Sequence, residues 1–235
     1  MFIRFEDRQS DSPVIERVWR SHSERAGEFH SMATPNWVMV VTHLRGQTFL
    51  TVRGPESRAS IAECPGDGQW IGIHFRLGTF MPLMSNQALR DRNDATLPCL
   101  SGRTFLLDGS AWEYPDFDNA EVFAERLVRK GLVAMDRHVE DVLRGREGEV
   151  SLRTQQRQIL RATGITRITA QQISRVRRAT WMLRSGIPAL DVAHGLAYYD
   201  QAHLNRSLRR FVGLTPAQVA RGEGQLSLLY KPDAE

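Results

Sequence analysis

Between residues 187 and 216 the apolar positions twice follow the period of an α-helix. In the second run, Leu204, Leu208 and Phe211 have the i, i+4, i+7 spacing that forms a stripe along one side of a helix. A shorter helix is predicted just before it, with one side formed by Ile187, Leu190, Ala193 and His194. Two short helices in close succession outline a helix-turn-helix unit.

Polar and special residues mark the ends of the second helix. Asp200 precedes the apolar stripe, where its carboxylate can accept hydrogen bonds from the free N–H groups of the first turn. Gly213 follows the stripe and supplies the left-handed residue that ends many helices. Thr215 and Pro216 then have the pattern that caps and starts another helix.

If the apolar stripe packs inward, the opposite face of this helix is exposed and polar. That face contains Gln201, Ala202, Asn205, Arg206 and Arg209. Amide and guanidinium groups on one helix face are suited to base edges and phosphates. Many small helical domains share this periodicity, so one unit alone is a weak signal.

The same pattern occurs a second time, 49 positions earlier in the chain. The shift places Gly213 on Gly164, Asp200 on Ser151, Arg206 on Arg157, Leu208 on Ile159 and Thr215 on Thr166. A repeat of this length suits a whole supersecondary unit. It predicts a first helix over residues 152–163, and apolar positions over 169–184 predict a helix that connects the two units.

These residues resemble the AraC-type transcription regulators over about residues 119 to 222. The matching motifs of the second unit are Val192-Ala193, Ala197-Tyr198, Asp200, Arg206 and the run from Gly213 to Pro216. The resemblance implies an all-α domain with two helix-turn-helix units joined by a long helix, and double-stranded DNA as the partner. Ala197 departs from the family by standing where a turn glycine is usual, and Gln155 by standing where a core aliphatic residue is usual.

The resemblance also suggests roles for side chains on the two helices. Arg157 and Arg206 are expected to approach guanine or phosphate, and Gln156, Gln201 and Asn205 to read adenine directly or through water. The remaining expected DNA contacts are Arg153, Thr154, Arg161, Ala202, Arg209 and Arg210, of which Arg161, Arg209 and Arg210 neutralise phosphates. Two reading helices on one rigid connector should enter successive major grooves, about 34 Å apart.

Charge is distributed unevenly along the chain. Residues 150–222 contain twelve arginines, no lysine and two acids, which makes this segment +10 in a chain whose net charge is +4. The rest of the chain therefore carries −6. This asymmetry favours a polyanion partner for the C-terminal half; the alternative is an arginine-rich, solvated surface of an ordinary helical domain.

Residues 1 to about 115 have the pattern of a β domain. Short runs rich in β-branched and aromatic residues occupy positions 14–19, 37–42, 48–52, 70–75 and 104–107, and turn-forming residues separate them. Such a pattern predicts a small barrel or sandwich. A cupin-like N-terminal domain that senses a small molecule or mediates dimerisation is common in regulators of this family, and the resemblance implies one here.

One run alternates cleanly, with Ile71, Ile73 and Phe75 on one side and Trp70 and His74 on the other. Trp37, Trp70 and His74 are candidates for an effector pocket, because such pockets combine aromatic walls with a few polar groups. Ordinary core and sheet packing is the alternative for each of them.

Catalysis and a resident metal are not expected. His22, His30, His43 and His74 form no HxH or HxxxH pair, and Cys64 and Cys99 lie far apart without metal-ligand spacing, so no cofactor is predicted. The competing hypothesis is a cupin-like enzyme whose basic helical appendage binds RNA or a partner. It requires a metal or an acid/base pair, neither of which the sequence offers.

A change from strand to helix pattern near Pro115 marks a domain boundary. The predicted domains are a sensory and dimerisation domain over 1–117, a DNA-binding domain over 118–222 and a tail over 223–235. The first helix after the boundary belongs either to the DNA-binding domain or to an interdomain or dimer contact.

No apolar run has membrane-spanning length, so we expect a soluble cytoplasmic protein without membrane contact. Expected partners besides DNA are a small-molecule effector, a second copy of the chain and, for an activator, RNA polymerase.

Overall fold

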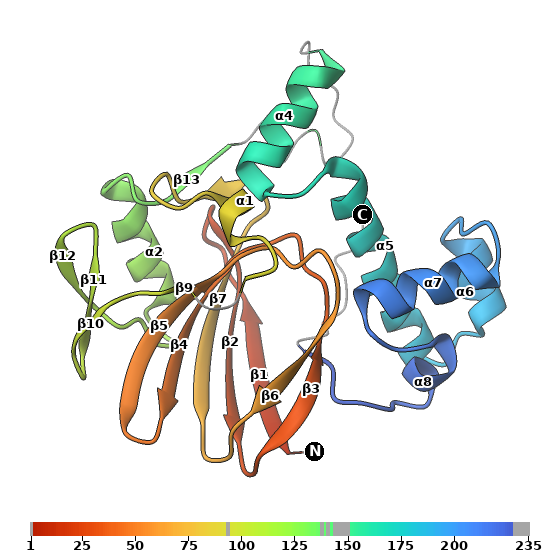
Figure 1. Ribbon diagram of the computed structural model, residues 1–235, viewed down its shortest axis with the longest axis horizontal. Coiled ribbons are helices and arrows are strands. Elements are labelled where there is room, and N and C mark those ends of the chain that lie inside the picture. Colours follow the sequence, from red (N-terminus) through yellow and green to blue (C-terminus); the bar gives the residue numbers. More distant parts are fainter. Residues whose placement is uncertain (1, 93–94, 137–138, 140–141, 143–150, 228–235) are drawn as a thin grey trace.

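The computed structural model describes residues 2–92, 95–136, 139, 142 and 151–227. A β-rich N-terminal part is followed by a helical C-terminal part, as the sequence predicted. In Figure 1 the strands form the centre of the molecule, and the last four helices lie together at one side of them. The cupin-like topology of the β domain stays a prediction.

The largest sheet has six strands in the order β1-β2-β7-β4-β5-β9, all paired antiparallel. Its strands are β1 (Ile3–Gln9), β2 (Ile15–Ser23), β7 (Gln69–Phe75), β4 (Val38–Leu44), β5 (Gln47–Arg53) and β9 (Ala95–Thr96). The four predicted runs that fall in this sheet are confirmed as β2, β4, β5 and β7. The edge strand β1 was missed, because its sequence IRFEDRQ has few apolar residues.

Smaller sheets surround the large one. They pair β3 (Gly27–Ser31) with β6 (Ser60–Cys64), β8 (Thr79–Phe80) with β13 (Ala134–Met135), and β11 (Thr104–Leu107) with β10 (Cys99–Ser101) and β12 (Ser110–Glu113). A short helix, α1 (Asn86–Leu89), follows β8, and α2 (Ala120–Arg129) follows β12. Figure 1 shows β3 and β6 on the side of the molecule that faces the C-terminal helices, and α2 with β10–β12 on the other side.

Helix α2 packs on the β domain. Its buried residues Ala120, Phe123, Ala124 and Leu127 belong to the same core as Ile73 and Phe75 of β7. The Arg8 guanidinium on β1 also donates to both carboxylate oxygens of Glu121, at 2.6 and 2.8 Å. The sequence left open a place in the DNA-binding domain or an interdomain or dimer contact for this helix, whereas the structure packs it into the core of the β domain. The boundary at 117/118 stays a prediction.

The C-terminal helices match the predicted pattern closely. They are α4 (Leu152–Thr163), α5 (Arg167–Arg184), α6 (Ala189–Gly195), α7 (Gln201–Phe211) and α8 (Pro216–Ala220). The predicted caps are present, because Ser151, Thr166, Asp200 and Thr215 each accept a hydrogen bond from the backbone of the helix that follows. Gly164 and Gly213 adopt the left-handed conformation, with φ of 73° and 84°. The helical pattern of the sequence continues with Val139, Val142 and Leu143, and most of that stretch lies outside the described residues.

The predicted side of α6 was right for Ala193 and for the partly buried Ile187, but wrong for Leu190 and His194. Leu190 is 54% exposed and His194 is also exposed, while Val192 and Ala193 are fully buried. The helix begins after Pro188, and its inward positions are 189, 192, 193 and 196, which follow the i, i+3, i+4, i+7 spacing. The prediction took Leu190 for a core residue because it is apolar, although single exposed leucines are common.

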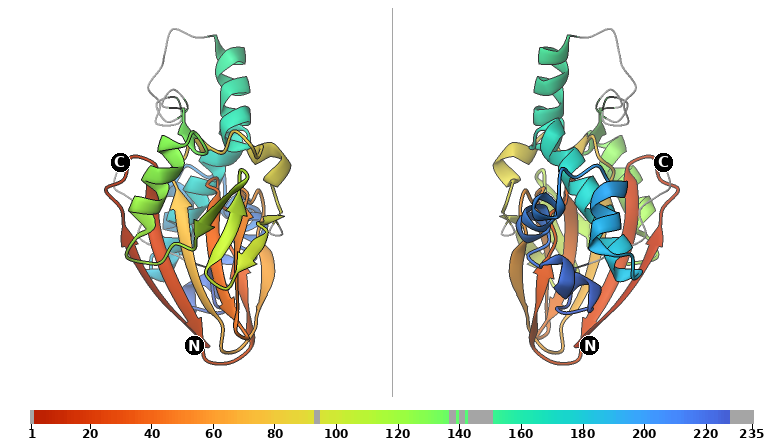
Figure 2. Two further views of the ribbon diagram at one scale, coloured as in Figure 1. Left: turned by 90° about the vertical axis from the view of Figure 1, so that its left-hand side faces the viewer. Right: turned by 90° about the vertical axis from the view of Figure 1, so that its right-hand side faces the viewer.

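The β domain and the C-terminal helices share a hydrophobic cluster. Met32 and Ala33, which follow β3, are buried together with Ile173 and Val176 of α5 and Phe211 of α7. The tail adds to this contact: His30 N–H donates to the Gln225 carbonyl and Ser227 N–H to the His30 carbonyl, both at 2.7 Å. Leu226 between them is buried in the cluster, so this part of the tail packs back on the protein. The right-hand panel of Figure 2 shows the C-terminal helices in front of the strands.

Candidate nucleic-acid interface

The second helix-turn-helix unit consists of α6, a five-residue connection and α7. Ala197 in this connection has φ of 52°, so alanine does take the left-handed conformation for which the family uses glycine. Tyr198, the next residue, is buried, and the Arg175 guanidinium of α5 lies 4.3 Å from its ring centre. This contact and the Asp200 cap, whose carboxylate accepts from His203 N–H at 2.6 Å, orient the start of α7.

Helix α7 has the two faces that the sequence predicted. Leu204, Leu208 and Phe211 are buried in the core of the unit. The predicted DNA contacts on the other face are exposed, apart from Asn205, which is half-buried: Gln201, Ala202, Asn205, Arg206, Arg209 and Arg210. Burial confirms which face is available, whereas the contact of each residue with DNA stays a prediction.

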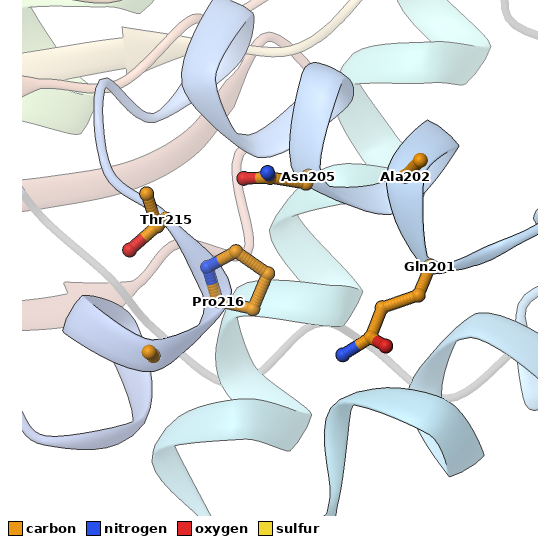
Figure 3. A pocket seen from close by; sticks show the side chains of 6 residues that line it. Gln201, Ala202, Asn205, Thr215 and Pro216 are labelled. Carbon is orange, nitrogen blue, oxygen red and sulfur yellow. The ribbon is translucent and has the colours of Figure 1, made fainter.

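A cavity of about 400 Å³ opens beside the N-terminal half of α7. Gln201, Ala202 and Asn205 line it from α7, and residues 215–217 line it from the start of α8 (Figure 3). The side-chain oxygen of Asn205 is buried and has no hydrogen-bond partner among the residues that the structure describes. A base edge or a bridging water can supply the missing donor, because buried polar atoms are nearly always paired.

Helix α4 of the first unit, like α7, has one buried face and one exposed face. Ile159 and Ala162 are buried against Val139, Val142 and the partly buried Phe80, so this unit has a small core of its own. On the outer face Thr154 is half-buried, and the other predicted contacts are exposed: Arg153, Gln156, Arg157 and Arg161. Gln155 is buried at the position where the family has an aliphatic residue, so the predicted departure affects the core and leaves the outer face intact.

The arginines on the outer faces of α4 and α7 have no acidic partners. Within the described part of the chain, no ion pair or side-chain hydrogen bond involves Arg153, Arg157, Arg161, Arg206, Arg209 or Arg210. The ion pairs found lie mainly in the β domain, such as Arg17 with Asp7 and Arg20 with Glu6. Unpaired guanidinium groups can neutralise phosphates and displace condensed counterions.

The β domain contacts the C-terminal end of each of these two helices. Asn86 of α1 donates its side-chain N–H to the Ala162 carbonyl of α4 at 2.5 Å. Ala33 and Ala59 donate their backbone N–H groups to the carbonyls of Phe211 and Arg210 at 2.8 Å. The last carbonyls of a helix lack partners within the helix, and here the β domain supplies donors for them. The N-terminal ends, which are expected to reach base edges, are left open.

The gap between α1 and α4 admits no side chain at Gly164. A Cβ there would lie 2.5 Å from the Asn86 carbonyl oxygen, and the residue also has positive φ. Glycine is therefore required at this position for two reasons, the turn conformation and the close approach of the two backbones.

The three candidate effector residues do not share one face. Trp37 is 2% exposed, its ring stacks on Phe75 at 3.8 Å, and its Nε1–H donates to the Thr79 carbonyl. Trp37 thus lies in the hydrophobic core beside Phe75. Trp70 and His74 lie on the opposite face of β7, because alternate residues of a strand point the same way.

Cross-strand pairing extends the Trp70 and His74 face over the sheet. His74 is paired with Arg17 on β2 and with Val38 on β4, and Val38 is paired with Arg53 on β5. Neither arginine was predicted from the sequence, although alternation along its strand puts Arg53 on this face. Burial lowers the pKa of His74 to about 3, with smaller contributions from the charges of Arg177 and Arg17, so its imidazole is neutral at pH 7.

Buried donors on this face lack a hydrogen-bond partner among the described residues. They include Nε of Arg53 and Nε1 of Trp19, which pairs with Gly72 one row along the sheet. Burial also lowers the pKa of Arg53 and raises the pKa of Glu56, whose carboxylate accepts from the Ser31 hydroxyl at 2.8 Å. The face therefore combines aromatic rings, a neutral imidazole and buried cationic donors.

Metal ligands do not converge anywhere in the part of the chain that is described: no group of three or more His, Cys, Asp or Glu side chains has the geometry to bind a metal ion. Among the same residues, no helix is both long and apolar enough to cross a lipid bilayer.

A basic helical domain with two exposed arginine faces, attached to a β domain, defines a DNA-binding transcription regulator. Residues 146–222 match the family model described as a helix-turn-helix domain, in the part of the chain that resembles the AraC-type regulators. No curated protein matches the chain. Among solved structures, ToxT from Vibrio cholerae is similar at 8% identity and a TM-score of 0.37, covering 92% of this chain and 98% of ToxT. The assignment as a helix-turn-helix protein depends on the matched segment and its helices.

Proposed function

We propose that α4 and α7 read DNA sequence by entering successive major grooves on one face of the duplex. The observation that carries this proposal is the pair of outer faces, each with arginines that lack acidic partners in the described structure and each supported by a buried apolar side. Helix α5 joins the two units, and its buried residues belong to the core of the second unit. A rigid connector of this kind sets the spacing that two grooves about 34 Å apart require.

Within each helix the roles follow from side-chain chemistry. Arg157 and Arg206 approach guanine or phosphate, since a guanidinium group can donate two hydrogen bonds to one guanine. Gln156, Gln201 and Asn205 bind adenine or a bridging water. Arg161, Arg209 and Arg210, which lie farther along the helices, neutralise phosphates.

The test is binding to duplex DNA selected from a random pool by the full-length protein. Arg157→Ala and Arg206→Ala should each weaken specific binding by about 1–3 kcal/mol, and Arg209→Ala should mainly reduce the salt dependence of binding. Arg103→Ala is the matched control, because Arg103 is exposed on the turn before β11 in the β domain. Unchanged binding by both reading-helix variants contradicts the placement of these helices on DNA.

We also propose that the β domain transmits an effector signal to the reading helices. The Trp70 and His74 face carries buried donors that lack a partner among the described residues, and an anionic or strongly polar effector can satisfy them. Arg177 of α5 lies close enough to influence both His74 and Glu56, and its guanidinium donates to the Ala33 carbonyl at 3.3 Å. An effector on this face is thus next to the connector of the two units.

A ligand screen on the full-length protein tests this second proposal. An effector of this face should lose binding in Trp70→Ala and Arg53→Gln variants and should change the affinity for DNA. A ligand that binds both variants as well as the unchanged protein contradicts the assignment. Metal analysis of the same preparation separates the regulator from the enzyme hypothesis, because a stoichiometric transition metal held by the β domain favours the enzyme.

The role as a DNA-binding regulator also implies further partners. A regulator of this kind acts in the cytoplasm where the DNA is, pairs with a second copy through its β domain, and contacts RNA polymerase if it activates transcription. Sedimentation analysis of the purified protein tests the pairing.

A further inference from the structure

A second cavity lies in the β domain, away from both the reading helices and the Trp70 and His74 face. Its volume is about 420 Å³, and it is formed by the end of β11, the turn after it, β12, and the last turn of α2. Figure 1 and the left-hand panel of Figure 2 show α2 and β10–β12 on the side of the large sheet that is remote from the C-terminal helices. The proposed function does not use this region.

Three cationic side chains converge on this cavity. Arg126, Arg129 and Lys130 line it together with one acid, Asp108, so the walls have an excess of two positive charges. Among the residues that the structure describes, none of the three cations takes part in an ion pair or a side-chain hydrogen bond. Cations at the end of a helix stabilise its dipole, but that effect does not require them to meet over a cavity.

The floor of the cavity is apolar and contains an unused donor. Leu107, Trp112 and Leu132 are each at most 5% exposed and line it from below the charged rim. The Arg126 guanidinium carbon lies 5.1 Å from the centre of the Trp112 ring. Nε1 of Trp112 is buried and has no hydrogen-bond partner among the described residues, a costly state that a ligand oxygen within reach of it would relieve.

We propose that this cavity binds a small organic dianion with an apolar or aromatic body. The double negative charge matches the net charge of the walls, the apolar body matches the leucine and tryptophan floor, and the volume is at the lower end for small-molecule sites. Two chemical sources share these properties, an aromatic dicarboxylate and an aryl phosphate monoester. The proposal is independent of DNA binding and of the effector face described above.

Calorimetric titration of the full-length protein with phthalate and with phenyl phosphate tests the site. Saturable binding of at least one dianion is expected, with benzoate about tenfold weaker and benzamide without measurable binding. Arg129→Gln combined with Lys130→Gln should weaken the dianion at least tenfold, and both residues are exposed, so the variant should fold normally. Arg45→Gln combined with Arg103→Gln, also exposed and not among the residues that line the cavity, is the matched control and should bind like the unchanged protein.

The indole N–H signal of Trp112 provides a second readout. The chain has five tryptophans, and Trp112→Phe identifies the signal by its disappearance. The bound dianion should shift this signal downfield, because Nε1–H gains an acceptor. The proposal is overturned if neither dianion binds saturably, if benzamide binds equally well, or if the double variant retains full affinity. Preference for phthalate or for phenyl phosphate decides between the two sources.

Discussion

The contact between Asn86 and α4 offers a direct test of how the β domain holds the first reading helix. Asn86 is 2% exposed, and its side-chain N–H groups donate to the Ala162 carbonyl at 2.5 Å and to the Thr79 carbonyl at 3.3 Å. The perturbation is Asn86→Ala. It removes both hydrogen bonds and deprives the Ala162 carbonyl, in the last turn of α4, of its donor from the β domain.

The magnitude follows from these two bonds. A typical hydrogen bond contributes about 0.5–1.5 kcal/mol net, and a buried carbonyl left without a donor costs about 1–3 kcal/mol. The side-chain oxygen of Asn86 lacks a partner within the described part of the chain, so its removal returns part of this free energy. We expect the free energy of unfolding to fall by about 1–3 kcal/mol, which corresponds to about 2–4 °C in Tm per kcal/mol for a chain of this size.

The assay combines thermal unfolding with DNA binding. Because the contact is at the C-terminal end of α4, its loss should weaken binding to a full site read by both helices. Binding to a truncated site read by α7 alone should be unchanged. The loss of affinity cannot exceed the lost contact free energy, so it should be at most about 100-fold.

Asn36→Ala is the matched control. Asn36 is also buried and donates to the Glu16 carboxylate and the Phe75 carbonyl, both at 2.7 Å, within the β domain. It should lower the Tm by a similar amount without favouring one DNA site over the other. The reasoning is refuted if Asn86→Ala strengthens binding to the full site, or if both variants change the two sites equally.

Three further predictions concern single residues. Ala197→Gly should raise the free energy of unfolding by about 0.5–1 kcal/mol, because glycine accepts the φ of 52° that strains alanine; an unchanged or lower Tm contradicts this. Asp200→Ala should lower it by about 1 kcal/mol through loss of the α7 cap, as measured by chemical denaturation, with exposed Asp191→Ala as the control. The Arg8 hydrogen bond lowers the pKa of Glu121 from 4.5 to about 2, so this contribution to stability is complete above pH 4.5 and is lost as the pH falls towards 2. Glu121→Gln should therefore flatten the acid side of the stability profile, and a profile equal to that of the unchanged protein would count against the pairing.

The sequence predicted the C-terminal helices well because their signals are local. A cap, an apolar stripe and a stop glycine lie within one helix length, and such elements determine a helix with little help from distant residues. This is why α4 and α7 begin and end where Ser151, Gly164, Asp200 and Gly213 predicted. The repeat then identified the outer faces, and burial confirmed them.

Strands with a weak apolar pattern were harder to find. β1 (IRFEDRQ) and β6 (SIAEC) are edge strands with mostly exposed side chains, so nothing in their sequences separates them from loops. Their pairing with β2 and β3 comes from register and backbone hydrogen bonds, which are long-range properties. The place of Trp37 also depended on long-range contacts. From the sequence, an aromatic residue near the start of a strand suits a pocket wall and a core equally well, and only its stacking on Phe75 shows that it belongs to the core.

The sequence by itself determined the helices, their caps and the arginine-rich outer faces, since these depend on residues within a few turns of one another. Only the tertiary structure decided what holds these faces in place. The Asn86 contact with α4, the two backbone hydrogen bonds to the end of α7 and the meeting of α2 with β12 over a charged cavity join segments far apart in the chain. Such contacts depend on how the elements pack together, and the periodicity of apolar residues within one segment does not predict that packing.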